Sequence, residues 1–237
     1  MKVILKLIAL PLMMLVDWRY QFRKFMFKKG TWKSVAFEIP IVSICGFEKN
    51  DNLNLDIEKV SCSVFSNSLC LQKRRYDGSE DTNSNTFFNA IPIQNKDQVY
   101  SYKHLLLAIS ELYSALKPDL VVLIDHDFDS EVRVDLKVFY TSLSGLISES
   151  LMPLGKRKYP LSALRDADFI VVNEVESFSQ IHDLIELGSI ASSQVIVLDI
   201  QKKLDISDDE IRIVSDHDNF GRILSESLRI NILTNQA

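Results

Sequence analysis

Residues 97–129 read DQVYSYKHLLLAISELYSALKPDLVVLIDHDFD, an amphipathic stretch followed directly by a continuous apolar one. The apolar residues of the first part recur at helical spacing: Leu105, Leu106, Ile109, Leu112 and Leu116. This period predicts a helix over 97–117 that ends before Pro118. Residues 120–124 are apolar at every position, which is typical of a strand buried on both faces. A helix that leads straight into such a strand is a repeating unit of α/β folds.

The same alternation extends along the chain. Strands are expected at 39–45, 59–67, 91–94, 135–142, 167–174 and 194–200, a helix at about 177–187, and an exposed polar loop at 72–90. We therefore predict an α/β fold with a mostly parallel sheet and helices on both faces. Ligands of such sheets bind at the carboxyl ends of the strands. That edge is expected to carry Gly46, the acidic residues after Ile124, and Asn173-Glu174.

The composition is that of an ordinary globular protein, with 237 residues, 46% hydrophobic and 25% charged. Its three cysteines, Cys45, Cys62 and Cys70, have no CxxC spacing, which indicates apolar residues in a reducing compartment and not a zinc site or a disulfide framework. The net charge of −5 gives no reason to expect a nucleic-acid partner.

The charge is unevenly distributed. Residues 1–33 hold eight Lys or Arg residues and one acid, Asp17, a net charge of +7, so the other 204 residues carry −12. The uninterrupted apolar part, 7–16, is shorter than the roughly 20 apolar residues that a spanning helix needs. The sequence therefore indicates an N-terminal domain, 1–33, followed by an α/β domain, 34–237.

We interpret residues 1–33 as an amphipathic helix that lies on a membrane surface. Trp18 suits the interface, and Arg19, Arg23 and Lys24 are expected to contact lipid phosphates. Two alternatives are a core-packed helix with a solvated basic face, and a signal peptide, which would lack a small-residue cleavage site here.

Residues 151–174, LMPLGKRKYPLSALRDADFIVVNE, resemble a signature of the tetraacyldisaccharide 4'-kinases, which phosphorylate the lipid A precursor. That signature reads close to Leu-Leu-Pro-Ala-Gly-Pro-Leu-Arg-Glu-Pro-Leu-Ser, then a short helix, Ala-Asp and an apolar strand ending in Asn. The residues in register are Pro153, Gly155, Pro160, Leu161, Ser162, Leu164, Ala167, Asp168 and Asn173. Similarity in the same order extends from residue 5 to about 225 and is patchy between 47 and 90. The resemblance implies a P-loop-NTPase-like fold, ATP and Mg²⁺ as cofactors, and a lipid A precursor as substrate.

The chain departs from this family after the first strand. The family has a glycine-rich loop, Gly-Gly-x-Gly-Lys-Thr, whose backbone N–H groups, Lys and Thr hold phosphates and Mg²⁺. Here Gly46 is followed by Phe-Glu-Lys-Asn-Asp, so Gly46 and Lys49 are the only candidates for nucleotide contacts. Glu48 and Asp51 would repel a triphosphate. The sequence indicates that an ancestral phosphate site has been removed.

The acidic edge is altered as well. Asp125 matches the first Asp of the family's Asp-Asp-Gly-Phe, while His126 and Asp127 replace the second Asp and the Gly. Asp125 and Asp127 are candidate metal ligands, since Mg²⁺ prefers carboxylate oxygens, and Asp125 is also a candidate catalytic residue. A solvated acidic loop is the alternative.

Two further segments carry candidate roles. Asp216-His217 matches the family's Asp-His, in which the carboxylate could hold the imidazole as a general base on a sugar hydroxyl, although such a pair in a loop can also be structural. Lys158 belongs to a basic cluster, 155–158, that could meet an acidic headgroup or simply be solvated. The chain ends about 20 residues after His217, where the family continues, so the α/β domain is shortened.

Three hypotheses follow. The first is a degenerate 4'-kinase homologue with weak or no phosphoryl transfer, located peripherally at the cytoplasmic face of the inner membrane. The second is an active but divergent 4'-kinase that uses Asp125 and His217. The third is a non-enzymatic, membrane-peripheral binding or scaffold protein that recognises lipid A intermediates or a partner.

Overall fold

The computed structural model describes residues 2–46, 68–75, 86–92, 100–102, 104–124, 131–143, 158–173, 175, 178–198, 211–214, 222–223 and 226–227. Its described residues fall into two compact units. The α3 unit is drawn from 34–45, 54–136 and 217–237, and the α1 unit from 1–33, 46–53 and 137–216. The predicted domain boundary at residue 33 stays a prediction.

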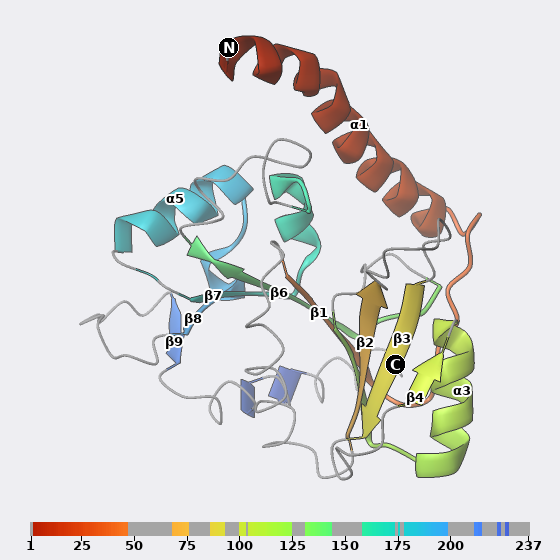
Figure 1. Cartoon of the computed structure of the whole chain (residues 1–237). Coiled ribbons are helices and arrows are strands. Elements are labelled where there is room, and N and C mark those ends of the chain that lie inside the picture. The colour runs from red at the N-terminus through yellow and green to blue at the C-terminus, as the bar shows by residue number, and fades with distance from the viewer. Residues whose placement is uncertain are drawn as a thin grey trace. The chain divides into compact units, whose positions relative to one another are not determined.

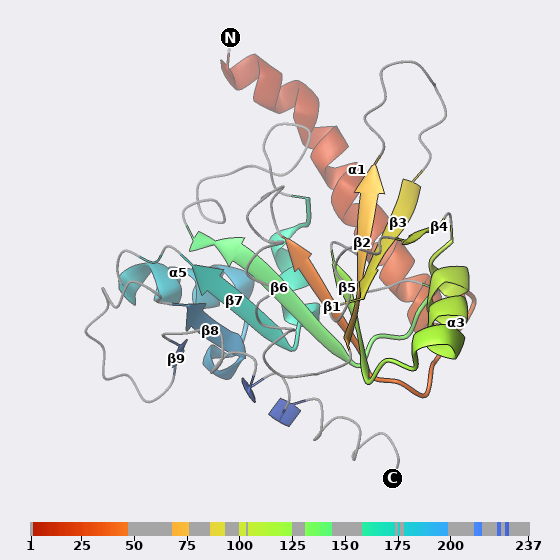
Figure 2. The same ribbon diagram turned by 60° about the horizontal axis from the view of Figure 1, so that its bottom comes forward.

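The α3 unit contains five strands of a mixed sheet in the order β4-β3-β2-β5-β1 (Figures 1 and 2). Their bounds are β1 Ile41–Gly46, β2 Ser68–Arg75, β3 Thr86–Pro92, β4 Tyr100–Tyr102 and β5 Leu120–Ile124. β5 lies between β1 and β2 and pairs with both in parallel, whereas β3 pairs antiparallel with β2 and with β4. Every residue of β1 and β5 is buried, as expected for central parallel strands.

Helix α3, Leu105–Leu116, covers this part of the sheet (Figure 1). Its buried residues are Leu105, Ala108, Ile109 and Leu112, spaced three or four apart, and they pack into one core with Leu69, Leu71, Val121 and Leu123 of the strands. The helix ends at Lys117, whose φ is 46°, and Pro118 follows. The helix–strand unit indicated by residues 97–129 is therefore confirmed, apart from its N-terminal part.

The α1 unit contains four strands paired in parallel, in the order β6-β7-β8-β9. Their bounds are β6 Leu136–Ser142, β7 Phe169–Asn173, β8 Val195–Leu198 and β9 Arg212–Val214. The helices are α1 Lys2–Lys28, α5 Phe178–Gly188 and the 3₁₀ helices η1 Leu161–Asp166 and η2 Ser192–Gln194. α5 contacts η1, and the side chain of Leu164 on η1 lies beside Gly188 at the end of α5.

In each unit, an aspartate just before a strand forms hydrogen bonds with the backbone of a neighbouring segment. The Ile41 N–H donates to Oδ2 of Asp135 at 2.9 Å, and the Asp135 N–H donates to the Ile41 carbonyl at 2.8 Å. In the α1 unit the Lys137 N–H donates to Oδ2 of Asp168 at 2.7 Å, and the Asp168 N–H returns a bond to the Lys137 carbonyl. Each pair satisfies backbone groups where a strand begins and so helps to fix the register.

The structure confirms the mostly parallel α/β class and the expected strands β1, β5, β6, β7 and β8, together with α5 and the helical character of the N-terminal segment. The loop expected at 72–90 is wrong at both ends, because β2 continues to Arg75 and β3 begins at Thr86. Polar residues can occupy these positions because an antiparallel pair tolerates a solvated face. The strand expected at 91–94 is the end of β3, and the one expected at 59–67 lies outside the described residues.

Two further differences are local. The helix predicted over 97–117 begins only at Leu105, and residues 100–102 form β4 instead, because the 3.6-residue period itself starts at Leu105. β9 was not expected, since a strand of three residues is too short to show a period.

Candidate functional site

The edge at the carboxyl end of β1 is where a P-loop protein has its phosphate-binding loop. Gly46 is the last residue of β1 and is buried. Ile44 of β1 lies beside Ile124, the last residue of β5, which in turn lies beside Gln72 of β2. These three parallel strands therefore run toward a common edge, which β2 passes by continuing to Arg75, and α/β proteins bind ligands at such an edge.

Most of the predicted chemistry lies outside the described residues. This is the case for Lys49, Asp125, Asp127, Asp216 and His217. Their roles as nucleotide, metal and catalytic residues stay predictions. Within the part of the chain that the structure describes, no group of three or more His, Cys, Asp or Glu side chains could hold a metal ion.

The residues that follow Gly46 do not have the chemistry of a phosphate site. Phosphate loops use glycines so that consecutive backbone N–H groups can approach the anion, and they end in Lys and a hydroxyl residue. The five residues after Gly46 include one cation, Lys49, two acids, Glu48 and Asp51, and neither a glycine nor a hydroxyl. ATP with Mg²⁺ therefore does not fit the donor set, although the preceding strand is in place.

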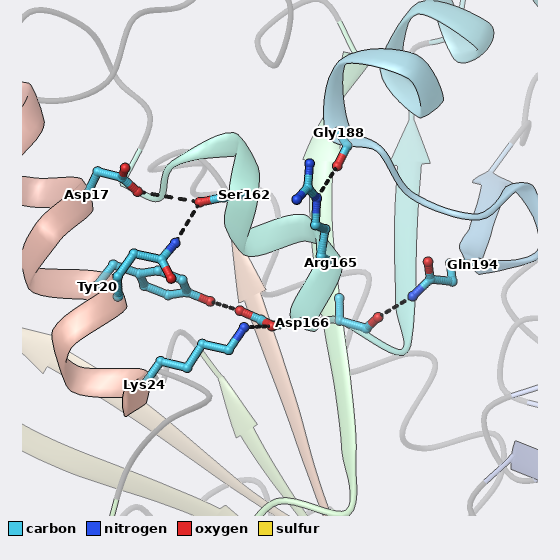
Figure 3. Close-up of polar contacts among 10 residues, drawn as sticks. Asp17, Tyr20, Lys24, Ser162, Arg165, Asp166, Gly188 and Gln194 are labelled. Carbon is cyan, nitrogen blue, oxygen red and sulfur yellow. Dashed lines mark hydrogen bonds and ion pairs between the residues drawn. The ribbon is translucent and has the colours of Figure 1, made fainter. Parts of the chain in front are cut away.

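The best-defined polar contacts of the α1 unit join α1 to η1 (Figure 3). The Tyr20 hydroxyl donates to Oδ2 of Asp166 at 2.7 Å, and the Lys24 ammonium forms an ion pair with Oδ1 of the same carboxylate. One turn earlier, Nε2 of Gln21 donates to the Ser162 hydroxyl at 3.1 Å, and this hydroxyl lies 3.4 Å from Oδ1 of Asp17. We call these six residues the docking contacts of α1.

The helix and the 3₁₀ turn are both positioned to make these contacts. Asp17, Tyr20, Gln21 and Lys24 are spaced three, one and three residues apart, so they project from adjoining positions on one side of α1. On η1, Ala163 and Leu164 are fully buried. Their burial anchors η1 so that Ser162 and Asp166 face α1. The Asp166 side chain retains only 14% of its exposure, against 39% for Lys24.

An aromatic contact supports the same interface. The ring of Tyr159 lies edge-on to Tyr20, with centroids 6.3 Å apart, and to the buried Phe139 of β6 at 5.3 Å. Tyr159 thus links the helix to the core of the α1 unit.

Arg165 and Gln194 stabilise the surroundings of η1 (Figure 3). Nε of Arg165 donates to the carbonyl of Gly188 at 3.1 Å, and Nε2 of Gln194 donates to the carbonyl of Ala167 at 2.8 Å. Both side chains satisfy carbonyls at the ends of helical turns, which indicates a structural role.

Asp168 precedes β7, and its pKa lies above the ordinary value of an aspartate. Burial raises the pKa of Asp168, and the N–H and the positive charge of Lys137 lower it in part. Its oxygen is committed to the start of β6. A displaced pKa at a position fixed in this way is explained by structure and needs no catalytic role.

The outward side of α1 has an unusual composition. Large apolar residues at helical spacing are exposed there: Met14 by 65%, Leu15 by 56%, Trp18 by 63%, Phe22 by 40% and Phe25 by 49%. The side that faces η1 contains half-buried residues such as Val16, Tyr20 and Phe27. A helix that belongs only to a globular surface would carry polar residues on its outward side, so this exposed apolar stripe marks an interaction surface.

The residues predicted to contact lipid occupy different positions. Trp18 and Arg19 are exposed, and Arg23 is half-buried with its guanidinium 6.0 Å from the Phe27 ring centre. Lys24 pairs with Asp166, and Lys158 is half-buried. Their lipid contacts stay predictions. Among the described residues, no helix has both the length and the apolar character required to cross a membrane.

Three residues of this region were not recognised from the sequence as contact-forming residues: Asp17, Gln21 and Asp166. The available signal was the polar row 17, 20, 21 and 24, which shares one side of a helix. Its partner on η1 has no signal in the sequence, because the two elements lie 141 to 146 residues apart in the chain.

Comparison with known proteins supports the fold. The structure is similar to the crystal structure of LpxK from Aquifex aeolicus in complex with ATP, with a TM-score of 0.55 and 15% identity over 92% of this chain and 90% of that chain. LpxK is a tetraacyldisaccharide 4'-kinase. No protein-family model and no curated protein matches the sequence. At this identity the likeness shows the fold alone, and the resemblance to the 4'-kinases is confirmed at that level.

Proposed function

We propose that this chain is a tetraacyldisaccharide 4'-kinase-like protein of lipid A biosynthesis that has lost most or all of its kinase activity. The observation that carries the proposal is the edge of the sheet at Gly46. The fold is shared with a kinase solved with ATP, and the first strand ends as such a kinase requires, but the residues that follow lack a phosphate-binding loop.

The expected loss of activity is large. Phosphoryl transfer depends on positioning the γ-phosphate and neutralising its charge, and one cationic contact of the arginine-finger type is worth about 10³–10⁵ in rate. Here the whole set of glycine N–H groups, Lys and hydroxyl is replaced, and two acids are introduced. An isolated Lys49 would not compensate for that change.

A second candidate function is non-enzymatic. On this view the protein acts as a membrane-peripheral binding or scaffold protein that recognises lipid A intermediates or a partner enzyme. The exposed apolar stripe of α1 favours it, because this surface needs no nucleotide to bind a membrane. Both candidates place the protein peripherally at the cytoplasmic face of the inner membrane, where the lipid A precursor or an anionic membrane surface would be its partner.

Calorimetric titration with a non-hydrolysable ATP analogue and Mg²⁺ tests the loss of the nucleotide site, with the Aquifex LpxK as positive control. We expect no heat of binding at millimolar nucleotide. Binding in the micromolar to millimolar range that disappears in Asp125→Ala would instead support the active, divergent kinase. In that case phosphorylation of the tetraacyldisaccharide should also be detected, and its dependence on His217 should be measured with His217→Ala.

Vesicle flotation separates the two remaining candidates. A degenerate kinase that still holds its lipid substrate should bind vesicles more tightly when the tetraacyldisaccharide is included. A protein that binds only the membrane surface should respond to lipid charge and not to this lipid. If the protein floats with no vesicle of either composition, the membrane-peripheral part of the proposal is wrong.

A further inference from the structure

The segment that follows α1 folds back onto the helix. The Gly30 N–H donates to the Phe27 carbonyl at 2.9 Å, and the Thr31 N–H donates to the Met26 carbonyl at 3.1 Å. Gly30 has a φ of 70°, a value that glycine adopts without strain. Together these features form a Schellman motif, a common way to end a helix and reverse the chain.

This reversal of the chain brings Trp32 into contact with aromatic residues of α1. The Trp32 ring lies edge-on to Phe22, with centroids 6.4 Å apart, and to Phe27 at 5.4 Å. Phe22 is in turn stacked on Trp18 at 5.3 Å. Trp32 is nevertheless 43% exposed, similar to Phe22 and Phe25. We call Trp18, Phe22, Phe25 and Trp32 the aromatic platform.

Cations lie around the aromatic platform, and residues 18–33 contain no acid. Arg19, Lys28 and Lys29 lie within one helical turn of Phe22 or Phe25, and the Lys29 ammonium is 4.5 Å from the Phe25 ring centre. Lys33 follows Trp32, and all four basic residues are exposed. The only acid among residues 1–33 is Asp17, whose carboxylate lies beside Ser162 on the docked side.

These observations specify the occupant. Trp and Phe rings that keep about half of their surface in water are suited to the boundary between headgroups and acyl chains. Each nearby Lys or Arg adds about 1 kcal/mol of attraction to an anionic lipid surface, and residues 18–33, which carry cations and no acid, complement that lipid. A soluble acidic partner would not require four exposed aromatic rings.

We propose that the aromatic platform and the four surrounding cations form one composite site for an anionic phospholipid surface, with Trp32 as a second interfacial anchor beside Trp18. The proposal rests on the membrane-peripheral part of the proposed function and adds the site and the lipid chemistry. It moves the expected phosphate contacts from Lys24, which pairs with Asp166, to Arg19, Lys28, Lys29 and Lys33. Because η1 contacts a different side of α1, the site is accessible while the helix stays docked.

The chain offers an internal reporter, because its only tryptophans are Trp18 and Trp32. In Trp32→Phe the fluorescence comes from Trp18 alone, and in Trp18→Phe from Trp32 alone. Each full-length variant is mixed with phosphatidylcholine vesicles, with and without added phosphatidylglycerol. We expect a blue shift from both tryptophans with the anionic vesicles, and a smaller shift or none with phosphatidylcholine alone.

Affinity provides the second measurement. Trp32→Ala should weaken binding to phosphatidylglycerol-containing vesicles by roughly tenfold or more, as expected when a large aromatic side chain no longer leaves water. Leu187→Ala is the control, since Leu187 is an apolar residue on α5 that is 56% exposed, against 43% for Trp32, and its replacement should leave the affinity unchanged. Circular dichroism verifies that both variants are folded.

The outcomes are distinct. If the wild type binds neither kind of vesicle, the membrane-peripheral function fails and this inference fails with it. If the wild type binds but Trp32 shows no blue shift and Trp32→Ala binds normally, the function stands and the composite site is wrong. If both tryptophans respond equally to neutral and anionic vesicles, the role of the four cations is refuted.

Discussion

The carboxylate of Asp166 on η1 is predicted to hold α1 in place. Replacing Asp166 with Ala should therefore loosen the contact between α1 and η1. Tyr20 donates to this carboxylate at 2.7 Å, and a hydrogen bond to a charged group contributes about 1.5–3 kcal/mol. The ion pair with Lys24 contributes about 1 kcal/mol or less, because the Lys24 side chain is 39% exposed and is screened by water. We therefore expect Asp166→Ala to cost roughly 2–4 kcal/mol.

Urea titration followed by tryptophan fluorescence measures this cost directly, because Trp18 and Trp32 both belong to the α1 unit. The expected order of destabilisation is Asp166→Ala first, Tyr20→Phe second and Lys24→Met last. Lys24→Met serves as the control for charge, since it keeps the apolar stem of the side chain.

A double-mutant cycle decides whether the contact itself is responsible. Tyr20→Phe and Asp166→Ala should be non-additive by about 1–2 kcal/mol, because the second change removes a bond already lost in the first. Full additivity would refute the argument, as would a cost for Lys24→Met equal to that of Tyr20→Phe. Additivity would mean that apolar packing holds the helix, and an equal cost would mean that the ion pair contributes as much as the Tyr20 hydrogen bond.

Two further predictions concern stability. Burial raises the pKa of Asp168 above 3.8, so the native state holds the proton of this carboxyl more tightly than the unfolded chain does. The contribution of Asp168 to the free energy of unfolding therefore declines as pH rises from 3.8 through the native pKa. Asp168→Asn keeps an acceptor for the Lys137 N–H. The stability of this variant relative to wild type, measured by urea titration, should rise over that pH interval. A stability difference that does not change with pH would contradict the assignment. On α3, Ile109 is fully buried and Leu107 is 49% exposed. Ile109→Ala should cost about 2–5 kcal/mol and Leu107→Ala less than about 0.5, measured by circular dichroism during denaturation, and similar costs would show that the helix does not face the core as described.

The sequence was informative wherever burial imposes a period. Strand β5 is apolar throughout and β1, β6 and β7 are mostly apolar, because a parallel strand covered on both faces admits few polar residues. Helix α3 shows a 3.6-residue period from Leu105 onward, and that is where the helix begins. β2 beyond Leu71 and the start of β3 were missed because strands of an antiparallel pair need not be continuous apolar runs, and β9 was missed because three residues hold no period.

The candidate sites divide in the same way. The missing phosphate loop can be read from the residues after Gly46, because that chemistry depends on consecutive residue types. The amphipathic, basic character of residues 1–33 is also a local property. The contacts of these residues do not follow from the local sequence. Lys24 and Arg19 are both basic residues of the same helix, yet Lys24 pairs with Asp166 and Arg19 is exposed.

The sequence by itself therefore determined the α/β class, the lack of a glycine-rich phosphate loop after Gly46 and the charge of the N-terminal helix, since each follows from short-range patterns of burial and residue chemistry. Only the tertiary structure decided which side of α1 is docked, that Asp166 receives Tyr20 and Lys24, and that Trp32 returns to the row of Trp18 and Phe22. These contacts join segments that lie far apart in the chain or depend on a backbone reversal at Gly30. Packing selects them among many arrangements that the same local preferences allow.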